Sequence, residues 1–288
     1  MTHIADQAPQ FDRFALCDNC KAETVEEFAT KFDLRYLRCS GCGFTFTDLS
    51  DFDYQSFNDQ SIGDLKSMHI DKVTAPKHLR KYKNRLAQFE RYRNTNNLLE
   101  IGCSTGGFLN AARGANWKEY GVEPVVESAN YAIDTLKLNV HVGLLDTAQF
   151  ESNSFDVIYS NAVIEHIAHP SHVFDQMYSL LRPGGLMYAD TVNLDSYTWQ
   201  FLGREWKLFD PRVHLSLYTP ITLRHFCENA GFQVLNIETH GVRFYATRAE
   251  RPTGMSRWVD EVRKLPYSAL SRVNLRGDSI AVFAIKPE

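Results

Sequence analysis

The sequence predicts an α/β fold made of parallel βαβ units, preceded by a small cysteine-rich module. Three observations lead to this prediction. From Leu98 onward, short apolar runs typical of strands alternate with amphipathic runs typical of helices. A glycine-rich turn joins the first of these strands to the helix that follows. Four of the six cysteines lie in two Cys-x-x-Cys pairs near the N-terminus.

The expected elements follow one another at regular spacing. Strands are expected at residues 98–101, 119–122, 139–142, 155–160, 186–192, 232–239 and 279–285. Helices are expected at residues 76–92, 108–113, 128–138, 171–181 and 219–230. The last of these has Thr219 as N-cap, Pro220 at its first position and Gly231 at its end. A polar stretch at 243–276, with a helical core near 256–265, is expected to form a cap or an insertion.

The composition is that of a folded protein of ordinary polarity, with 44% hydrophobic and 23% charged residues. The formal net charge of -4 gives no reason to expect a nucleic acid partner. No apolar run approaches the roughly 20 residues that a membrane span requires, and the first 14 residues do not resemble a secretion signal. We therefore expect a cytoplasmic protein without a membrane partner, and the sequence leaves its oligomeric state open.

The four N-terminal cysteines are the first candidate site. Cys17 and Cys20 form one pair, and Cys39 and Cys42 form a second pair eighteen residues further on. This spacing is typical of a tetrahedral zinc site, and a reducing compartment disfavours disulfides. Because four thiolates leave no open coordination position, we expect structural Zn²⁺ rather than a catalytic ion. Thiols without metal are the alternative.

The turn from Gly102 to Gly106 is the second candidate site. Glycines here allow positive φ and a close approach of a ligand, and the following helix offers free N–H groups. Glu123 and Pro124 follow about twenty residues later at the end of the next strand, where a carboxylate can accept hydrogen bonds from ribose hydroxyls. A solvated glutamate is the alternative. Dinucleotide folds use G-x-G-x-x-G, whereas here Glu100 precedes the first glycine.

Four motifs between residues 98 and 192 together resemble class I S-adenosylmethionine-dependent methyltransferases. Glu100 to Gly106 is similar to motif I of that family, E/D-x-G-x-G-x-G, with Ser104 in place of the middle glycine. Val122-Glu123-Pro124 is similar to the ribose-binding acidic position. Phe155 to Ile167 resembles the "FD…LEH" strand and loop, and Leu180 to Gly185 the "LLRPGG" turn. The resemblance implies a Rossmann-like, seven-stranded methyltransferase sheet with helical cap segments, and S-adenosylmethionine as cofactor.

The resemblance also implies roles for individual residues. The backbone of the glycine turn would hold the methionine end of the cofactor, and Glu123 would hold the ribose. The adenine-contacting loop would fall at residues 143–146, with Leu144 where the family often has an acidic residue. Asn161 would line the cleft near the methionine portion. The full predicted set is Glu100, Gly102, Ser104, Gly106, Glu123, Pro124, Leu144, Leu145 and Asn161.

The N-terminal module resembles ribbons of the form "CxxC…RCxxCGFxF", found in methyltransferases of sugar and natural-product biosynthesis, and Arg38 to Phe46 fits that form. We expect a zinc ribbon at 1–48, an aromatic and helical lid segment at 49–93, and the cofactor-binding domain at 94–288 with its insertion at about 243–276. The expected acceptor is a small molecule or glycan, methylated on oxygen. An RNA-directed enzyme that uses the ribbon, and a sugar C-methyltransferase, are the alternatives.

Methyl transfer requires a positioned acceptor and a group that takes its proton. Histidine suits this role because its pKa lies near neutrality. The candidates are His166, directly after the cofactor-lining loop, and His214, in a segment that resembles "DPxxHLxxFTPxTL". For His166 a structural role is the alternative, and for His214 the choice between base and binding group stays open. Candidates for lining the acceptor pocket, with buried packing as the alternative, are Glu165, Tyr197, Trp199 and Trp206.

Overall fold

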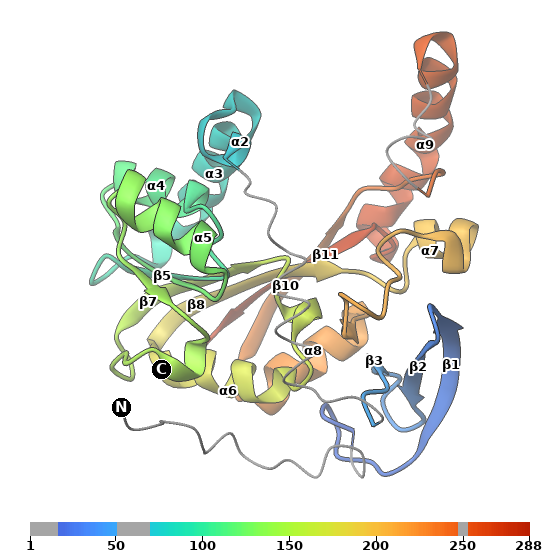
Figure 1. Ribbon diagram of the computed structural model, residues 1–288, viewed down its shortest axis with the longest axis horizontal. Coiled ribbons are helices and arrows are strands. Elements are labelled where there is room, and N and C mark those ends of the chain that lie inside the picture. Colours follow the sequence, from blue (N-terminus) through green and yellow to red (C-terminus); the bar gives the residue numbers. More distant parts are fainter. Residues whose placement is uncertain (1–16, 51–69, 247–252) are drawn as a thin grey trace.

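The computed structural model describes residues 17–50, 70–246 and 253–288 (Figure 1). Residues 51–69, which make up much of the predicted lid segment, lie outside the described residues. The same holds for residues 1–16 and for residues 247–252 of the predicted insertion.

A seven-stranded sheet forms the centre of the molecule. Its parallel strands are β4 (Asn97–Ile101), β5 (Lys118–Glu123), β6 (Val140–Val142), β7 (Phe155–Asn161) and β8 (Leu181–Val192). Two strands with antiparallel pairing, β10 (Gln233–His240) and β11 (Ser279–Ile285), complete the order β10-β11-β8-β7-β4-β5-β6. The first six residues of β7 are all buried, as expected for a central strand covered on both faces. The predicted α/β class with a seven-stranded sheet is confirmed.

Helices cover both faces of this sheet (Figure 1). On one face lie α3 (Pro76–Phe89) and α4 (Gly107–Gly114), which pack against side chains that include Val157 and Tyr159 of β7. On the other face lie α6 (Pro170–Leu180) and α8 (Pro220–Asn229), which share a core with Phe155 and Ile158. From Val157 to Tyr159, successive side chains thus alternate between two apolar cores, as the period of a strand requires.

Three helical elements differ from the predictions. The expected helix at 128–138 is shorter: α5 (Val126–Asn130) continues as the π-helical turn η2 (Tyr131–Thr135), and Lys137 then adopts a φ of +57° that ends the helix. The helix expected near 256–265 is longer, because α9 (Gly254–Asn274) runs through Pro266. The short helix α7 (Tyr197–Leu202) was not predicted, although Ser196 caps it by accepting from Trp199 N. Short helices complete the set: α2 (Asp71–Thr74), η1 (Glu90–Tyr92), η3 (Leu145–Thr147), η4 (Ile164–His166) and η5 (Gly203–Glu205).

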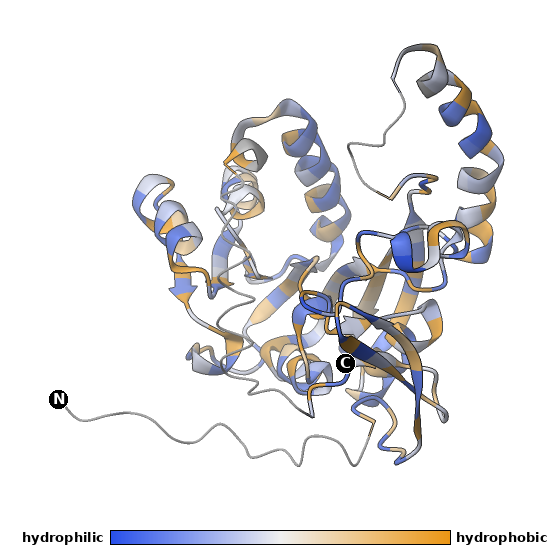
Figure 2. Cartoon of the chain, turned by 45° about the vertical axis from the view of Figure 1, so that its right-hand side comes forward, coloured by the Kyte–Doolittle hydropathy of each residue, from blue (hydrophilic) through white to orange (hydrophobic). Residues whose placement is uncertain are grey.

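The helix α9 projects from the body of the molecule, and hydrophilic and hydrophobic stretches alternate along it (Figure 2). Among its side chains, Met255 and Trp258 are largely exposed. No helix in the described ranges combines the length and the apolar character that a membrane crossing demands.

A second, four-stranded sheet contains the N-terminal module. Its strands are β1 (Val25–Lys31), β2 (Leu34–Cys39), β3 (Thr45–Thr47) and β9 (Ser216–Leu217), in the order β1-β2-β3-β9. The first three come from the N-terminal segment, whereas β9 comes from the chain after the main parallel strands. Thr45 pairs with Leu217 and Phe46 with Ser216, both antiparallel. The module is therefore joined to the large domain by strand pairing.

Candidate cofactor and acceptor site

The glycine turn between β4 and α4 leaves no room for side chains at its two ends. Gly102 and Gly106 adopt φ values of +70° and +77°. A Cβ atom at Gly102 would lie 2.4 Å from Val163 Cγ2, and one at Gly106 would lie 2.4 Å from Leu138 Cδ1. Glycine is thus favoured at both positions for two reasons: the positive φ, and the lack of space for a Cβ atom. The backbone of this turn can therefore approach a ligand closely.

Ser104 occupies the middle position of the turn with a φ of +50°. This is the left-handed region, where a residue with a Cβ atom costs about 1–2 kcal/mol. The structure therefore explains the family pattern: glycine suits the middle position because of its backbone conformation. Serine is accommodated there at an energetic cost.

Glu123 connects the glycine turn to the end of β5. Its Oε2 accepts a hydrogen bond from Ser104 N at 2.7 Å, and its Oε1 accepts one from Val125 N at 2.9 Å. Burial raises the pKa of Glu123, and the two backbone N–H donors oppose the rise. Pro124, partly buried, lies between these contacts. Each carboxylate oxygen can accept a further hydrogen bond, so the geometry is compatible with the predicted ribose contact.

The other predicted cofactor residues lie at the ends of neighbouring strands. Glu100 is buried in β4, in register with Gly121 and Tyr159. Leu144, just after β6, is 47% exposed, whereas Leu145 is buried.

Asn161 ends β7, and its Oδ1 is buried without a hydrogen-bond partner in the part of the chain that the structure describes. A buried acceptor of this kind needs an explanation, and a bound ligand would supply one. This buried acceptor and the closed glycine turn are both compatible with a bound S-adenosylmethionine molecule.

One contact, between Asp156 and Arg182, joins the two remaining family motifs, "FD…LEH" and "LLRPGG". Asp156 is fully buried, and its Oδ2 accepts hydrogen bonds from the backbone N atoms of residues 94, 95 and 96 at 2.7–2.8 Å. Its Oδ1 accepts a bond from Arg182 Nε at 2.7 Å, and Arg182 also donates to Tyr92 O. This pair fixes the chain where it enters β4, so the contact stabilises the fold.

The structure brings His166 and His214 together, although 47 residues separate them in the chain. Their ring centroids are 5.0 Å apart. His166 Nδ1 lies 2.8 Å from Val213 O, and His214 Nδ1 lies 2.6 Å from Leu208 O. Because a carbonyl only accepts, each Nδ1 carries the hydrogen, and in the neutral ring Nε2 keeps a lone pair. Burial lowers the pKa of His214, which favours that neutral form.

Glu165 completes a three-residue cluster with these histidines. Its carboxylate is buried, and its Oε2 accepts a hydrogen bond from Thr191 Oγ1 at 2.7 Å.

The aromatic candidates for the acceptor pocket pack elsewhere. Trp206 is buried, and Trp199 lies against Phe28 and Phe209, in a core that joins the N-terminal module to the large domain. Tyr197 contacts Tyr267 of α9. Buried packing thus describes Trp206, whereas Tyr197 and Trp199 are partly buried and their place in an acceptor pocket stays a prediction.

One titratable residue beside the cofactor site was missed. Asp190 lies in β8, in register with Asn161, and burial raises its pKa from 3.8 to about 6. The available signal was an acidic residue within an otherwise apolar strand.

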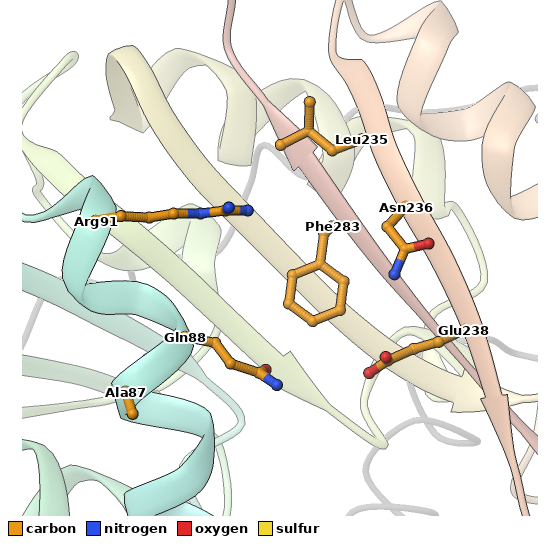
Figure 3. Close-up of a pocket in the computed structure, with 7 residues that line it drawn as sticks. All are labelled: Ala87, Gln88, Arg91, Leu235, Asn236, Glu238 and Phe283. Atoms are coloured by element: carbon orange, nitrogen blue, oxygen red, sulfur yellow. The ribbon is translucent and has the colours of Figure 1, made fainter.

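A separate pocket of about 400 Å³ lies between α3 and the strands β10 and β11 (Figure 3). None of its seven lining residues belongs to the predicted cofactor set. Those residues are Ala87, Gln88, Arg91, Leu235, Asn236, Glu238 and Phe283.

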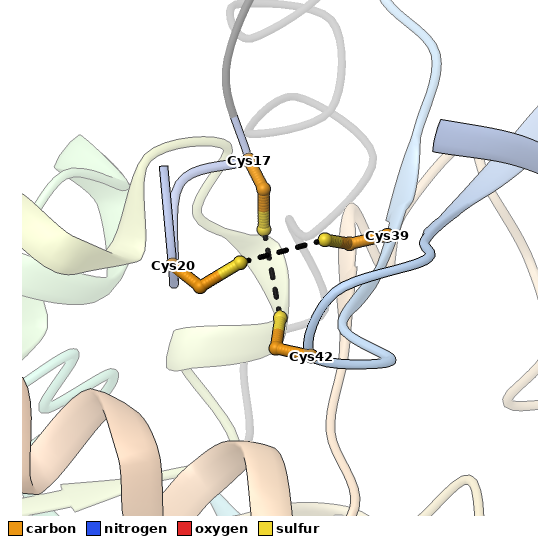
Figure 4. A group of neighbouring side chains, drawn as sticks. All are labelled: Cys17, Cys20, Cys39 and Cys42. Carbon is orange, nitrogen blue, oxygen red and sulfur yellow. Dashed lines mark hydrogen bonds between the residues drawn. The ribbon is translucent and has the colours of Figure 1, made fainter. Parts of the chain in front are cut away.

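The four N-terminal cysteines converge on one point (Figure 4). The Sγ atoms of Cys17 and Cys42 are 3.7 Å apart, and those of Cys20 and Cys39 are 3.5 Å apart. All four sulfur atoms lie within 4.8 Å of one another. A tetrahedral zinc ion with Zn–S bonds of about 2.3 Å would separate its sulfur ligands by about 3.8 Å. The donor set therefore fits zinc.

The cysteine module contacts the elements that carry the histidine pair. Asp18 accepts hydrogen bonds from Ser171 N at 2.7 Å and Ser171 Oγ at 2.6 Å, in the first turn of α6. Tyr36 OH donates to His214 O at 2.7 Å. The segment before β9, which carries His214, is thus held by the N-terminal module.

Comparisons with known proteins agree with this geometry. A family model described as "Methyltransferase domain" matches residues 74–237. The chain is 30% identical over 151 residues to a ubiquinone biosynthesis O-methyltransferase of Psychrobacter arcticus, over 47% of this chain and 58% of the relative. It therefore spans little more than half the length of that relative.

Two solved structures show the same fold. One is an S-adenosylmethionine-dependent methyltransferase from Archaeoglobus fulgidus, with 19% identity and a TM-score of 0.51 over 72% of this chain and 94% of that one. The other is Haemonchus contortus phosphoethanolamine N-methyltransferase 2 in complex with S-adenosyl-L-methionine, with 19% identity and a TM-score of 0.51 over 72% of this chain and 53% of that one. The family match covers more than half of the chain, which therefore belongs to the methyltransferase-domain family and has the fold of its class I, S-adenosylmethionine-dependent members.

Proposed function

We propose that the protein transfers a methyl group from S-adenosylmethionine to an oxygen atom of a small molecule or glycan. The observation that carries this proposal is the turn from Gly102 to Gly106, which is closed to side chains and bonded through Ser104 N to Glu123. A turn of this shape, at the carboxyl end of a parallel strand, is suited to hold an adenosine-containing cofactor.

The proposed site assigns each contact to a residue already described. Gly102, Ser104 and Gly106 would hold the methionine end, with Glu100 in the strand below them. Glu123, next to Pro124, would hold the ribose, and Leu144 and Leu145 would contact the adenine. The Asn161 amide would hold the methionine portion. When bound, the cofactor supplies an electrophilic methyl group on a sulfonium.

Two findings support an oxygen acceptor. The matched relatives include O-methyltransferases by name, one for ubiquinone biosynthesis and one for malonyl-[acyl-carrier protein]. Burial also lowers the pKa of His214, which favours the neutral imidazole that removal of a hydroxyl proton requires. Their predicted role as catalytic residues stays a prediction, and a sugar C-methyltransferase remains the alternative for the same site.

We also propose that zinc bound by Cys17, Cys20, Cys39 and Cys42 is structural. Four thiolates around one ion exclude substrate from it. The domain division remains our proposal as well: a ribbon at 1–48, a lid segment at 49–93 and the catalytic domain at 94–288.

An RNA-directed enzyme would need the surface of this ribbon to be free. The ribbon instead buries Phe44 against Tyr218 and Phe226, and uses Asp18 to bond α6. This burial and the net charge of -4 favour a small acceptor over RNA. A cytoplasmic location stays an expectation from the sequence.

Calorimetry on the full chain with S-adenosylmethionine and with its demethylated product tests the cofactor. Because a hydrogen bond to a charged group contributes about 1.5–3 kcal/mol, Glu123→Gln should weaken binding about 10- to 100-fold. Exposed Glu151 provides the matched control, Glu151→Gln, which should bind as the wild type does. Absence of binding by the wild type would refute the proposed function, and full binding by Glu123→Gln would refute the ribose assignment.

Metal analysis of the purified chain tests the ribbon separately. One zinc ion per chain is expected, and the ion should be lost in Cys39→Ser. A preparation from native conditions that contains no zinc would refute the structural ion and leave the cofactor proposal intact.

A further inference from the structure

Beside the cofactor site lies a second donor cluster, formed by Glu165, His166 and His214. One ligand atom from each of these residues lies within 4.8 Å of the others. The first two belong to the turn η4 at the carboxyl end of β7, and the third precedes β9. The cluster combines two imidazoles with one carboxylate, and it is separate from the four cysteines.

Both imidazoles are held in the orientation that metal-ligating histidines usually have. Each Nδ1 bonds a backbone carbonyl, Val213 O for His166 and Leu208 O for His214. This contact fixes the tautomer and leaves Nε2 as the free donor atom.

Glu165 is buried, with 1% of the residue exposed. Among the ion pairs of the described residues, none joins Glu165 to a lysine or an arginine. The one hydrogen bond described for its side chain comes from Thr191 Oγ1. Removing a carboxylate from water costs several kcal/mol unless a cation compensates. A divalent ion between this carboxylate and the two imidazoles would provide that compensation.

The cluster is also rigid, because hydrogen bonds join its two segments. Tyr218 OH donates to Ile164 O at 3.1 Å, and Ser216 Oγ donates to Ile167 O at 2.7 Å. The bond from His166 Nδ1 to Val213 O joins the same two segments. The three donors are therefore held in place before any ion arrives, which is what a metal site requires.

The position of the cluster relates it to the cofactor site. Val163, which would contact any side chain at Gly102, belongs to the same turn as Glu165 and His166. Asn161 lies at the start of that turn. Ligands of open parallel sheets bind at this edge, so an ion held here would lie next to the cofactor cleft.

We propose that Glu165, His166 and His214 bind one divalent metal ion, whose open coordination positions take the hydroxyl oxygen of the acceptor. Three protein ligands of this kind with open positions are typical of catalytic zinc and of non-haem iron sites. Two open positions would favour an acceptor with two neighbouring oxygen atoms. The role in methyl transfer rests on the proposed function, whereas the binding of the ion does not.

The ion would act as a Lewis acid on the acceptor. The bound hydroxyl loses its proton to solvent, and its oxygen lone pair forms the bond to the methyl carbon. The C–S bond breaks at the same time, and its electron pair stays on sulfur as the neutral thioether. The ion is unchanged. With the ion bound, the two histidines act as its ligands, and this role replaces the proton-acceptor role predicted for them in the metal-free site.

Titration of the full chain, with zinc already in its ribbon, tests the proposal. The probes are Mn²⁺ and, separately, one further equivalent of Zn²⁺, measured by calorimetry and by Mn²⁺ electron paramagnetic resonance. Carboxylate ligands suit Mn²⁺ and thiolates do not, so Mn²⁺ reports on the new site and leaves the ribbon alone. One additional ion per chain is expected.

The variants separate ligands from neighbours. Glu165→Gln and His214→Ala should abolish uptake of the additional ion. Thr191→Val, which removes only the hydroxyl on Glu165, should weaken binding about 10- to 100-fold. The matched control is His172→Ala, because His172 and Asp146 form an exposed histidine–carboxylate pair at 2.9 Å. This control should bind the ion as the wild type does.

Two binding results would overturn the proposal: a wild type that binds neither probe beyond the zinc of the ribbon, or a folded Glu165→Gln that binds as tightly as the wild type. If a variant fails to fold, nitrogen NMR of wild-type histidines decides, because the Nε2 signals of His166 and His214 alone should shift with Zn²⁺. Unshifted signals refute the site. S-adenosylmethionine binding, measured on the same sample, shows independently whether the proposed function holds.

Discussion

Replacing Asp156 by asparagine tests whether the Phe155-Asp156 motif builds the fold. The carboxylate is fully buried and accepts four hydrogen bonds, three from the backbone of residues 94–96 and one from Arg182 Nε. Asparagine has the same shape but only one oxygen. Its amide group must therefore face either the three backbone N–H groups or the guanidinium, and both are donors.

The expected loss follows from these contacts. A hydrogen bond to a charged group contributes about 1.5–3 kcal/mol, but four bonds to one group are not additive. Removing one partner of a buried ion pair costs about 3–5 kcal/mol. We therefore expect the free energy of unfolding to fall by about 3–5 kcal/mol, a large part of the roughly 5–15 kcal/mol typical of a domain.

Urea unfolding followed by circular dichroism measures this change. The control is Asp175→Asn, at an exposed position of α6, which should stay within about 0.5 kcal/mol of the wild type. The affinity of the folded Asp156→Asn protein for S-adenosylmethionine should be unchanged. A variant with the stability of the control, or one that loses cofactor binding at unchanged stability, would refute the structural role.

Three further changes test the turn and the edge of the sheet. Gly102→Ala should weaken cofactor binding more than 10-fold by calorimetry, because the new Cβ meets Val163; binding at the wild-type level would contradict the geometry. Ser104→Gly should raise the free energy of unfolding by about 0.5–1 kcal/mol, the left-handed cost of about 1–2 kcal/mol less the entropic cost of glycine. A lower stability would instead assign a role to the serine side chain. Asp190 has a native pKa of about 6 against 3.8 in its ordinary state, so the native protein binds this proton more tightly. Its contribution to stability is full below pH 3.8 and is lost as the pH rises through 6. The free energy of unfolding should therefore fall by up to about 3 kcal/mol over this pH range in the wild type, and this fall should be absent in Asp190→Asn. The same pH profile for both proteins in urea unfolding would contradict the shift.

The sequence predicted the central sheet well because its signals are local. The strand from Phe155 is a continuous apolar run, and Thr219-Pro220 marks a helix start in the chain itself. The pairing of Thr45 with Leu217 left no such signal, because two residues of β9 are too few to show a period. The end of α5 was missed for a similar reason, since Lys137 gives no sign of its left-handed backbone.

In the candidate site too, some residues could be predicted from local sequence signals and others could not. The glycines of the turn could be located because the backbone there needs their conformational freedom, and a turn of this kind has a recognisable pattern. Trp199 and Trp206 could not be assigned, because a tryptophan in a pocket and one in a core look alike in a sequence. The carbonyl contacts that orient His166 and His214 depend on the tertiary structure, and no spacing could have predicted them.

The strand β9 has a consequence for dividing this protein into parts. A chain cut before residue 49 would lose the ribbon and leave β9 as a bare edge, with Tyr218 and Phe226 uncovered where Phe44 now lies. An unpaired edge beside exposed aromatic rings is prone to aggregation. Exchange of ribbons between related proteins would therefore have to carry the segment from His214 to Phe226 along with the N-terminus. A single cut in the sequence therefore cannot separate the ribbon together with all of its contacts from the large domain.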